Sequence, residues 1–215
     1  MDTVSAEQFL LDQLPLRYRP LIPTTLKTAY SAVNKLVEAE PILQVESAVD
    51  NRGRIISWAV DRAFMRLIET QQWPFEFRWR EFAKPTGRYL EIQLSHSVVS
   101  ISQVADPTKQ PRNVVFRENG RLNNEPFFDL EEFREERVVR GFPHFLLLHG
   151  YQEINFAHLV VPHALHDRDF IYRTSNLLMM PHELPSEAAP VENTDFEAAM
   201  TLKEEIEKWR RDHGE

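Results

Sequence analysis

Three polar residues in the middle of the chain have the types and spacing that could hold a divalent metal ion. Glu76 lies on the polar side of one predicted strand, and Glu91 and Gln93 lie two residues apart in the next. Carboxylate oxygens are the ligands that Mg²⁺ prefers, and the bound ion can activate water against a phosphodiester. The same alternation is also what the solvent side of an ordinary hairpin requires. Both interpretations follow from the spacing.

The elements around these residues resemble the core of the PD-(D/E)XK nucleases. Within residues 53–95 a long helix precedes a strand carrying an acid and then a strand carrying E-x-Q. The resemblance implies a Mg²⁺-dependent nuclease in which Glu76 and Glu91 hold the metal and Gln93 positions water. The chain departs from the family pattern in three respects. Glu76 replaces the usual Asp, Gln93 replaces the usual Lys, and no Pro-Asp dipeptide precedes the acid.

Histidines supply a second candidate metal site. Six of the eight histidines fall between positions 144 and 182, and His163, His166 and Asp167 lie together in a predicted loop. Imidazole and carboxylate groups at this spacing could bind a divalent ion, although no HExxH motif occurs. The alternative is that the histidines are structural, as we expect of His149 and His158 on facing strands. No other metal or cofactor is predicted.

Basic side chains gather in residues 78–121, which contain eight basic and four acidic residues. A local excess of this kind attracts phosphates, and it can equally be an ordinary solvated strand face. Aromatic residues from Trp73 to Phe82 could stack nucleic-acid bases beside the arginines, or they could fill the core. The predicted nucleic-acid contacts are Arg78, Arg80, Lys84, Arg88, Arg112 and Arg117.

Nucleophilic catalysis has less support in the sequence. Ser95, Ser97, Ser100 and Ser102 surround His96, but neither a GxSxG nor an SxxK motif occurs.

The elements that must position these residues follow from hydrophobic periodicity. Apolar residues at helical spacing predict helices over 5–14, 24–40 and 53–72, the last capped by Asp50 or Asn51. Period-2 alternation predicts strands over 75–82, 88–95 and 97–104, and continuous apolar runs predict a hairpin over 142–161. A short strand is expected at 114–116, a charged helix over 129–140, and short closing segments at 169–173 and 176–180.

This order predicts an α+β fold in which N-terminal helices pack on a mainly antiparallel sheet. Residues 1–180 are expected to form a single domain, helical over 1–72 and mainly strands over 73–180. Within it, the 53–72 helix should pack on the sheet face that carries Phe77, Trp79 and Ile92. Residues 181–193 are rich in proline and small residues and predict a linker.

The C-terminal segment is expected to be an acidic amphipathic helix over 194–213. Residues 181–215 contain four basic and ten acidic side chains, a net charge of −6 out of −8 for the whole chain. A helix of this kind commonly docks on a partner protein or a second copy of the chain. Its predicted anchors are Phe196, Met200, Ile206 and Trp209.

Composition excludes several classes of function. The chain has no cysteine, which rules out disulfides, thiolate metal sites and cysteine nucleophiles, and with six glycines it contains neither GxGxxG nor GxxxxGK[ST]. Neither a signal peptide nor a membrane span is visible. We therefore expect a soluble, cytoplasmic, non-catalytic regulatory or adaptor protein that acts by binding a macromolecule. A protein partner or self-association is expected, with nucleic acid possible and no membrane, and a Mg²⁺-dependent nuclease and a nucleic-acid-binding module are the alternatives.

Overall fold

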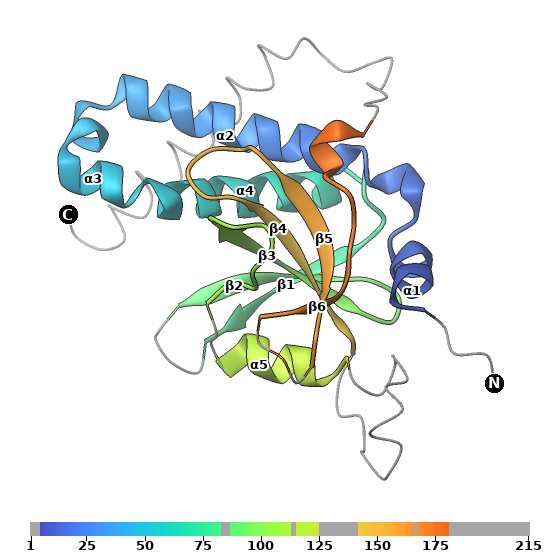
Figure 1. The fold of residues 1–215 in the computed structure, drawn as a ribbon. Helices are drawn as coiled ribbons and strands as arrows, with labels where there is room; N and C mark the ends of the chain where they lie inside the picture. The colour runs from blue at the N-terminus through green and yellow to red at the C-terminus, as the bar shows by residue number, and fades with distance from the viewer. Residues whose placement is uncertain are drawn as a thin grey trace.

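A computed structural model describes residues 5–82, 87–112, 115–124, 142–164, 166 and 168–180. Helices α2 and α4 lie side by side over one face of a six-stranded sheet, and the short helix α5 lies on the opposite face (Figure 1). The expected α+β class, with N-terminal helices on a mainly antiparallel sheet, is confirmed. The predicted helices over 129–140 and 194–213 lie outside the described residues.

An N-cap and a proline in the first turn account for where the N-terminal helices begin. In α1 (Ala6–Gln13) the Ser5 hydroxyl accepts a hydrogen bond from the Gln8 backbone N–H, which is a standard N-cap. After η1 (Leu16–Tyr18), α2 (Leu21–Ala39) begins three residues earlier than predicted. Pro23 is tolerated there because backbone N–H groups in the first turn have no acceptor within the helix.

Helix α4 (Arg52–Glu69) carries the apolar stripe that the sequence predicts, with Ile56, Val60, Phe64 and Leu67 all buried. Two unpredicted short elements precede it, η2 (Pro41–Gln44) and α3 (Glu46–Asp50). Asn51 occupies the N-cap position, but its side chain makes no cap. Its amide instead donates to the Ser47 carbonyl, an alternative open to short polar side chains.

The sheet has the strand order β1-β2-β3-β4-β5-β6. All neighbouring strands pair antiparallel except β3 and β4, which are parallel. The strand bounds are Glu76–Glu81 for β1, Arg88–Gln93 for β2, Val98–Val104 for β3, His144–Gly150 for β4, Ala157–Pro162 for β5 and Phe170–Arg173 for β6. A final turn, η4 (Leu177–Met179), follows β6.

The strand expected at 114–116 is wrong, because Val115 and Phe116 belong to helix α5 (Val115–Leu122). Parallel neighbours cannot be joined by a tight turn, so the chain must cross from the end of β3 back to the start of β4. Gly120 is part of α5. A β-carbon there would lie 2.4 Å from His144 Nδ1, so glycine permits the helix to approach the sheet closely.

Alternation along the strands gives the sheet two different faces. Ile92, Val99 and Phe145 join the main core beneath α2 and α4, while Leu146, Leu148 and Val160 form a smaller cluster on the α5 side. The predicted packing of α4 on Phe77 and Ile92 is confirmed. Trp79 departs from it with 43% of its surface exposed, because β1 is an edge strand. No described helix is both long and apolar enough to cross a membrane.

Candidate functional site

Strands β1, β2 and β3 present a polar surface on the α5 side of the sheet. Strand register places Arg78 opposite Glu91 and Arg80 opposite Tyr89, and Glu91 opposite Ser100 on β3. Directly opposed residues in antiparallel strands point to the same face. We call the side chains that share this face the polar face, which consists of Glu76, Arg78, Arg80, Tyr89, Glu91, Gln93, Ser100 and Ser102.

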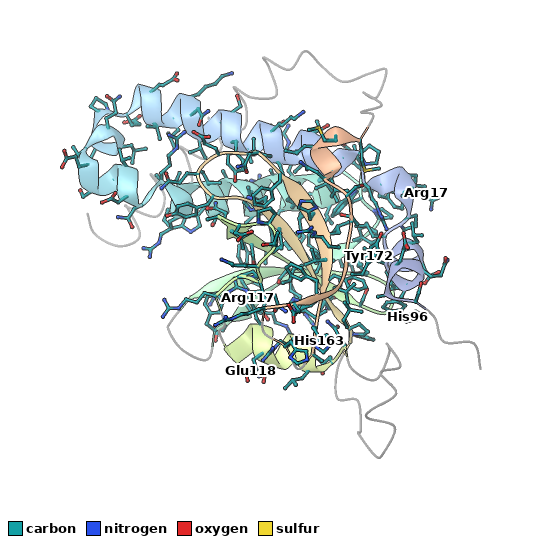
Figure 2. All side chains as sticks on the ribbon, viewed as in Figure 1. Arg17, His96, Arg117, Glu118, His163 and Tyr172 are labelled. Carbon is teal, nitrogen blue, oxygen red and sulfur yellow. The ribbon has the colours of Figure 1, made fainter. Side chains whose placement is uncertain are left out.

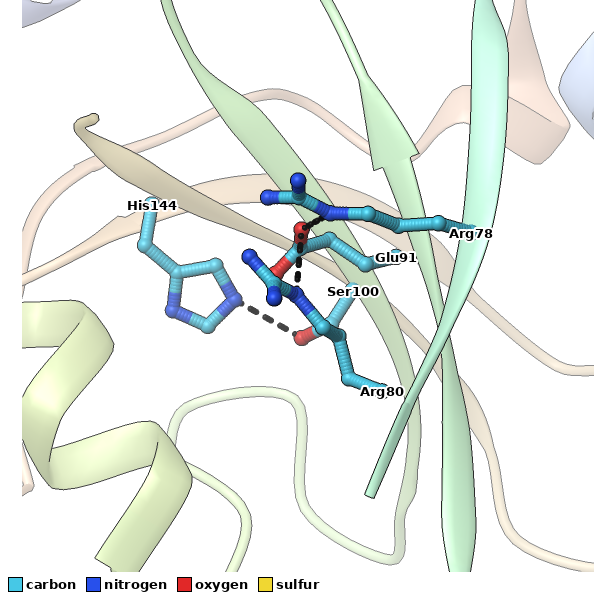
Figure 3. Close-up of polar contacts among 5 residues, drawn as sticks. All are labelled: Arg78, Arg80, Glu91, Ser100 and His144. Atoms are coloured by element: carbon cyan, nitrogen blue, oxygen red, sulfur yellow. Dashed lines mark hydrogen bonds and ion pairs between the residues drawn. The ribbon is translucent and has the colours of Figure 1, made fainter. Parts of the chain in front are cut away.

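Two arginines of the edge strand converge on one carboxylate at the centre of the polar face. Glu91 Oε1 accepts from Arg78 Nε at 2.5 Å and from Arg80 Nε at 3.2 Å (Figure 3). Glu91 is only 7% exposed, whereas the Arg78 and Arg80 side chains are 41% and 46% exposed. The carboxylate therefore holds two half-exposed guanidinium groups together at the surface. We call Arg78 and Arg80 the arginine pair.

The residues of the predicted nuclease site share this face. Glu76 is exposed and lies directly opposite Gln93 in the register, and Glu91 lies one rung away. With its amide oriented to satisfy both atoms, the Gln93 oxygen accepts from Arg78 Nη1 at 2.9 Å. The fold thus brings Glu76, Glu91 and Gln93 to one region of the polar face. There Glu91 forms ion pairs with Arg78 and Arg80, and Gln93 accepts hydrogen bonds from Arg78.

Behind the arginine pair, Ser100 and His144 form a buried hydrogen bond of 2.8 Å between Oγ and Nε2 (Figure 3). Burial, reinforced by the nearby Arg117 charge, lowers the pKa of His144 to about 4, so the imidazole is neutral at physiological pH. Gly120 closes over Nδ1, which has no hydrogen-bond partner among the described residues. Ser100 is only 2% exposed. A nucleophile needs access to substrate and an oriented base, so this pair fits a structural role better.

Helix α5 adds more positive charge beside the same strands. Arg117 lies between α5 and the sheet (Figure 2), where Nη2 donates to the Ser102 hydroxyl at 3.0 Å and Nη1 donates to the Arg112 carbonyl. Burial lowers the pKa of Arg117 to about 10, which still leaves it charged at neutral pH. Arg121, one turn on, is buried and lies 3.9 Å from Glu118.

The remaining predicted nucleic-acid contacts are Arg88, Arg112 and Lys84. Arg88 is exposed at the start of β2 and pairs with Glu81 at 3.2 Å. Arg112 is exposed before α5 and contributes its backbone carbonyl to Arg117. Lys84 lies outside the described residues.

The histidines predicted to bind a metal do not form a ligand set among the described residues. The His163 and His166 rings lie 4.5 Å apart, and His163 Nδ1 accepts from the His166 backbone N–H at 3.2 Å. Asp167 is outside the described residues. Among the described residues, no three His, Asp or Glu side chains gather closely enough to hold an ion.

His149, His158 and two of the serines take structural partners, as expected for the two histidines. His149 Nδ1 lies 2.8 Å from the Tyr30 hydroxyl, which itself donates to the Gly150 carbonyl. Because that hydroxyl proton is used, Nδ1 must carry the proton and donate. The Gln13 amide oxygen accepts from the Ser95 and Ser97 hydroxyls and from the His96 backbone.

Sequence reasoning named Phe82 as a stacking residue but missed Tyr89, which accompanies it beside the arginine pair. Of the predicted stacking residues, Trp73 is buried and Phe75 and Phe77 pack on the core. Tyr89 was not considered, yet its ring lies parallel to that of Phe82 at a centroid distance of 5.4 Å and an interplanar angle of 24°. The signal that could have found it is its position opposite Arg80 across the predicted hairpin. We call Phe82 and Tyr89 the aromatic pair.

Comparison with known proteins identifies no relative. No protein-family model, no curated protein and no solved structure matches the chain.

Proposed function

We propose that this protein acts by binding a macromolecule, and that the macromolecule is a nucleic acid contacted by the polar face. The observation that carries the proposal is the arginine pair held half-exposed by the buried Glu91 carboxylate. Each guanidinium uses its Nε toward Glu91. For Arg80 neither terminal nitrogen forms a hydrogen bond to another described residue, so these donors are left for phosphate oxygens.

The electrostatic setting supports the same ligand. Arg112 lies exposed before α5, and the half-buried Arg117 keeps the region between β3 and α5 positive. Phosphate contacts of this kind supply affinity without reading sequence.

Arg80→Gln tests this proposal, because it removes a charge whose terminal nitrogens bind no described residue. We expect fluorescence anisotropy with labelled DNA and RNA to report salt-dependent binding by the native protein. The variant should bind roughly tenfold more weakly and lose about one unit of the slope of log affinity against log salt.

Arg54→Gln is the matched control for this charge change. Arg54 is exposed on α4, beyond the opposite face of the sheet, so the same loss of charge there should leave affinity within about twofold. No binding by the native protein, or equal losses in both variants, would contradict the proposal.

A Mg²⁺-dependent nuclease is the second candidate, supported by the shared face of Glu76, Glu91 and Gln93. A metal ion would have to displace two guanidinium groups from Glu91. Under this reading Glu91→Gln abolishes cleavage of DNA or RNA with Mg²⁺ or Mn²⁺, because the carboxylate is required as a ligand.

The same variant separates the two functions. If the protein is a binder, the native chain cleaves no substrate, and Glu91→Gln weakens nucleic-acid binding because the carboxylate no longer holds the arginine pair together. A gel assay of cleavage beside an anisotropy titration distinguishes the two results.

A further inference from the structure

We infer that the nucleic acid is single-stranded, and that one of its bases stacks on the aromatic pair beside the arginine pair. This inference rests on the proposed function and names its substrate class. It begins from the register of β1 and β2, in which Arg80 lies directly opposite Tyr89. Opposed side chains in such a pair have β-carbons about 5 Å apart, so a phosphate contact and an aromatic ring are neighbours on one face.

The aromatic pair is held in place by the end of the hairpin. The Phe82 backbone N–H donates to the Gly87 carbonyl at 2.9 Å, which closes the hairpin end. Gly87 has a φ of +150°, and a β-carbon on it would lie 3.0 Å from the Phe82 ring. Glycine therefore allows the Phe82 ring to lie over the backbone and parallel to Tyr89. A ring fixed in this way loses little conformational freedom when a base stacks on it.

Both rings remain partly exposed, and Tyr89 is close enough to the charged groups to respond to them. Burial, together with the neighbouring Glu91 carboxylate, raises the pKa of the Tyr89 hydroxyl, which Arg80 and Arg78 partly offset. The phenol is therefore neutral at physiological pH. Its ring lies directly opposite Arg80, which in the proposed function contacts a phosphate.

Aromatic rings beside arginines favour single strands for a physical reason. In a duplex the faces of the bases are covered by neighbouring bases, whereas a single strand can turn a base out onto a protein ring. β1 is an edge strand, so a single nucleic-acid strand can lie along it without meeting another strand formed by the described residues. The juxtaposition of the arginine pair and the aromatic pair thus matches backbone phosphate and base of one strand.

The experiment compares four labelled ligands with the full-length protein: a single-stranded oligonucleotide, its duplex, an abasic single strand of equal length, and polyphosphate. We expect the single strand to bind at least tenfold more tightly than each of the others at the same salt concentration. Tyr89→Leu and Phe82→Leu should each weaken single-strand binding roughly tenfold and leave duplex and abasic binding within twofold. Tyr89→Phe keeps the ring and should rescue the affinity that Tyr89→Leu loses.

Trp79→Leu is the matched control, because Trp79 is a half-exposed aromatic on the opposite face of the same strand. It should leave single-strand affinity unchanged, and melting curves identify any variant that fails to fold. Equal affinity for single strand, duplex and abasic strand, or undiminished binding by Tyr89→Leu, overturns this inference. If that binding still depends on Arg80, the proposed function stands. Absence of binding to every ligand removes both.

Discussion

At the scale of single residues, the chain buries some ionisable groups beside an opposite charge and others without one. Glu91 is buried against two guanidinium groups, so its charge is balanced where it lies. Asp61 on α4 is half-buried, but no described residue forms a hydrogen bond or ion pair with its carboxylate. Burial raises the pKa of Asp61 to about 7 for this reason.

Asp61→Asn should therefore stabilise the protein in alkaline solution. A carboxyl group whose pKa is higher in the folded state contributes full stability below its ordinary pKa of 3.8 and loses that contribution as pH rises toward 7. Replacing it should raise the free energy of unfolding by about 1–4 kcal/mol at pH 8 and leave it unchanged near pH 3.5. Urea denaturation at both pH values measures the difference.

Two buried histidines make the whole protein respond to pH in the opposite sense. Burial lowers the pKa of both His144 and His149 to about 4, so their contribution is complete above pH 6.5 and is lost as pH falls toward 4. This loss is common to the native protein and Asp61→Asn, so the comparison isolates Asp61. Asp50→Asn, at an exposed site, should change stability by less than about 0.5 kcal/mol at either pH. A similar gain in both variants would show that Asp61 is not the cause.

At the scale of elements, α4 packs its large apolar side chains into the main core between the helices and the sheet. Phe64 is fully buried in it, and its ring lies 5.4 Å from that of Trp73. Trp73 in turn donates its indole N–H to the Tyr18 carbonyl, which ties α4 and β1 to the N-terminal helices. The contact between α4 and the sheet positions β1, and β1 carries the arginine pair.

Phe64→Ala should cost about 3–5 kcal/mol of folding stability, because it leaves a cavity where the ring now packs. Chemical denaturation gives the change, and an unaltered midpoint would show that the packing of α4 on the sheet is wrong. Phe64→Leu is the milder variant and should lose less, since most of the apolar volume is kept.

At the scale of the whole molecule, the acidic segment 181–215 carries most of the net charge and all four predicted partner anchors. An isolated helix of under about 20 residues is marginal in water, so Phe196, Met200, Ile206 and Trp209 need a surface to pack on. We expect that surface to belong to a partner protein or to a second copy of this chain.

Deleting residues 188–215 should then leave the melting temperature of the remainder nearly unchanged. The truncation should also abolish partner binding or convert an oligomer to a monomer, as measured by light scattering. Trp209→Ala is the finer variant and should cost about 2 kcal/mol or more of association free energy. Melting at a much lower temperature, or aggregation, would instead mean that the segment braces its own domain.

The sequence by itself determined the elements whose pattern is local. The stripe from Ile56 to Leu67 identifies a helix at a period of 3.6, and the alternation in β1 and β2 identifies a hairpin, because each signal needs only neighbouring residues. The same alternation places Glu76, Glu91 and Gln93 on one face. This shared face is the part of the candidate site that could be predicted from the sequence.

Only the tertiary structure decided what surrounds those residues. The parallel pairing of β3 with β4, the helical form of Val115 and Phe116, and the bond between Ser100 and His144 all depend on contacts between distant segments. Glu91 has the same place in the alternation whether it faces water or two arginines, and the register between β1 and β2 sets which of these it meets. Periodicity specifies the direction of a side chain, whereas its charge partners follow from the register between strands, which the alternation within one strand does not specify.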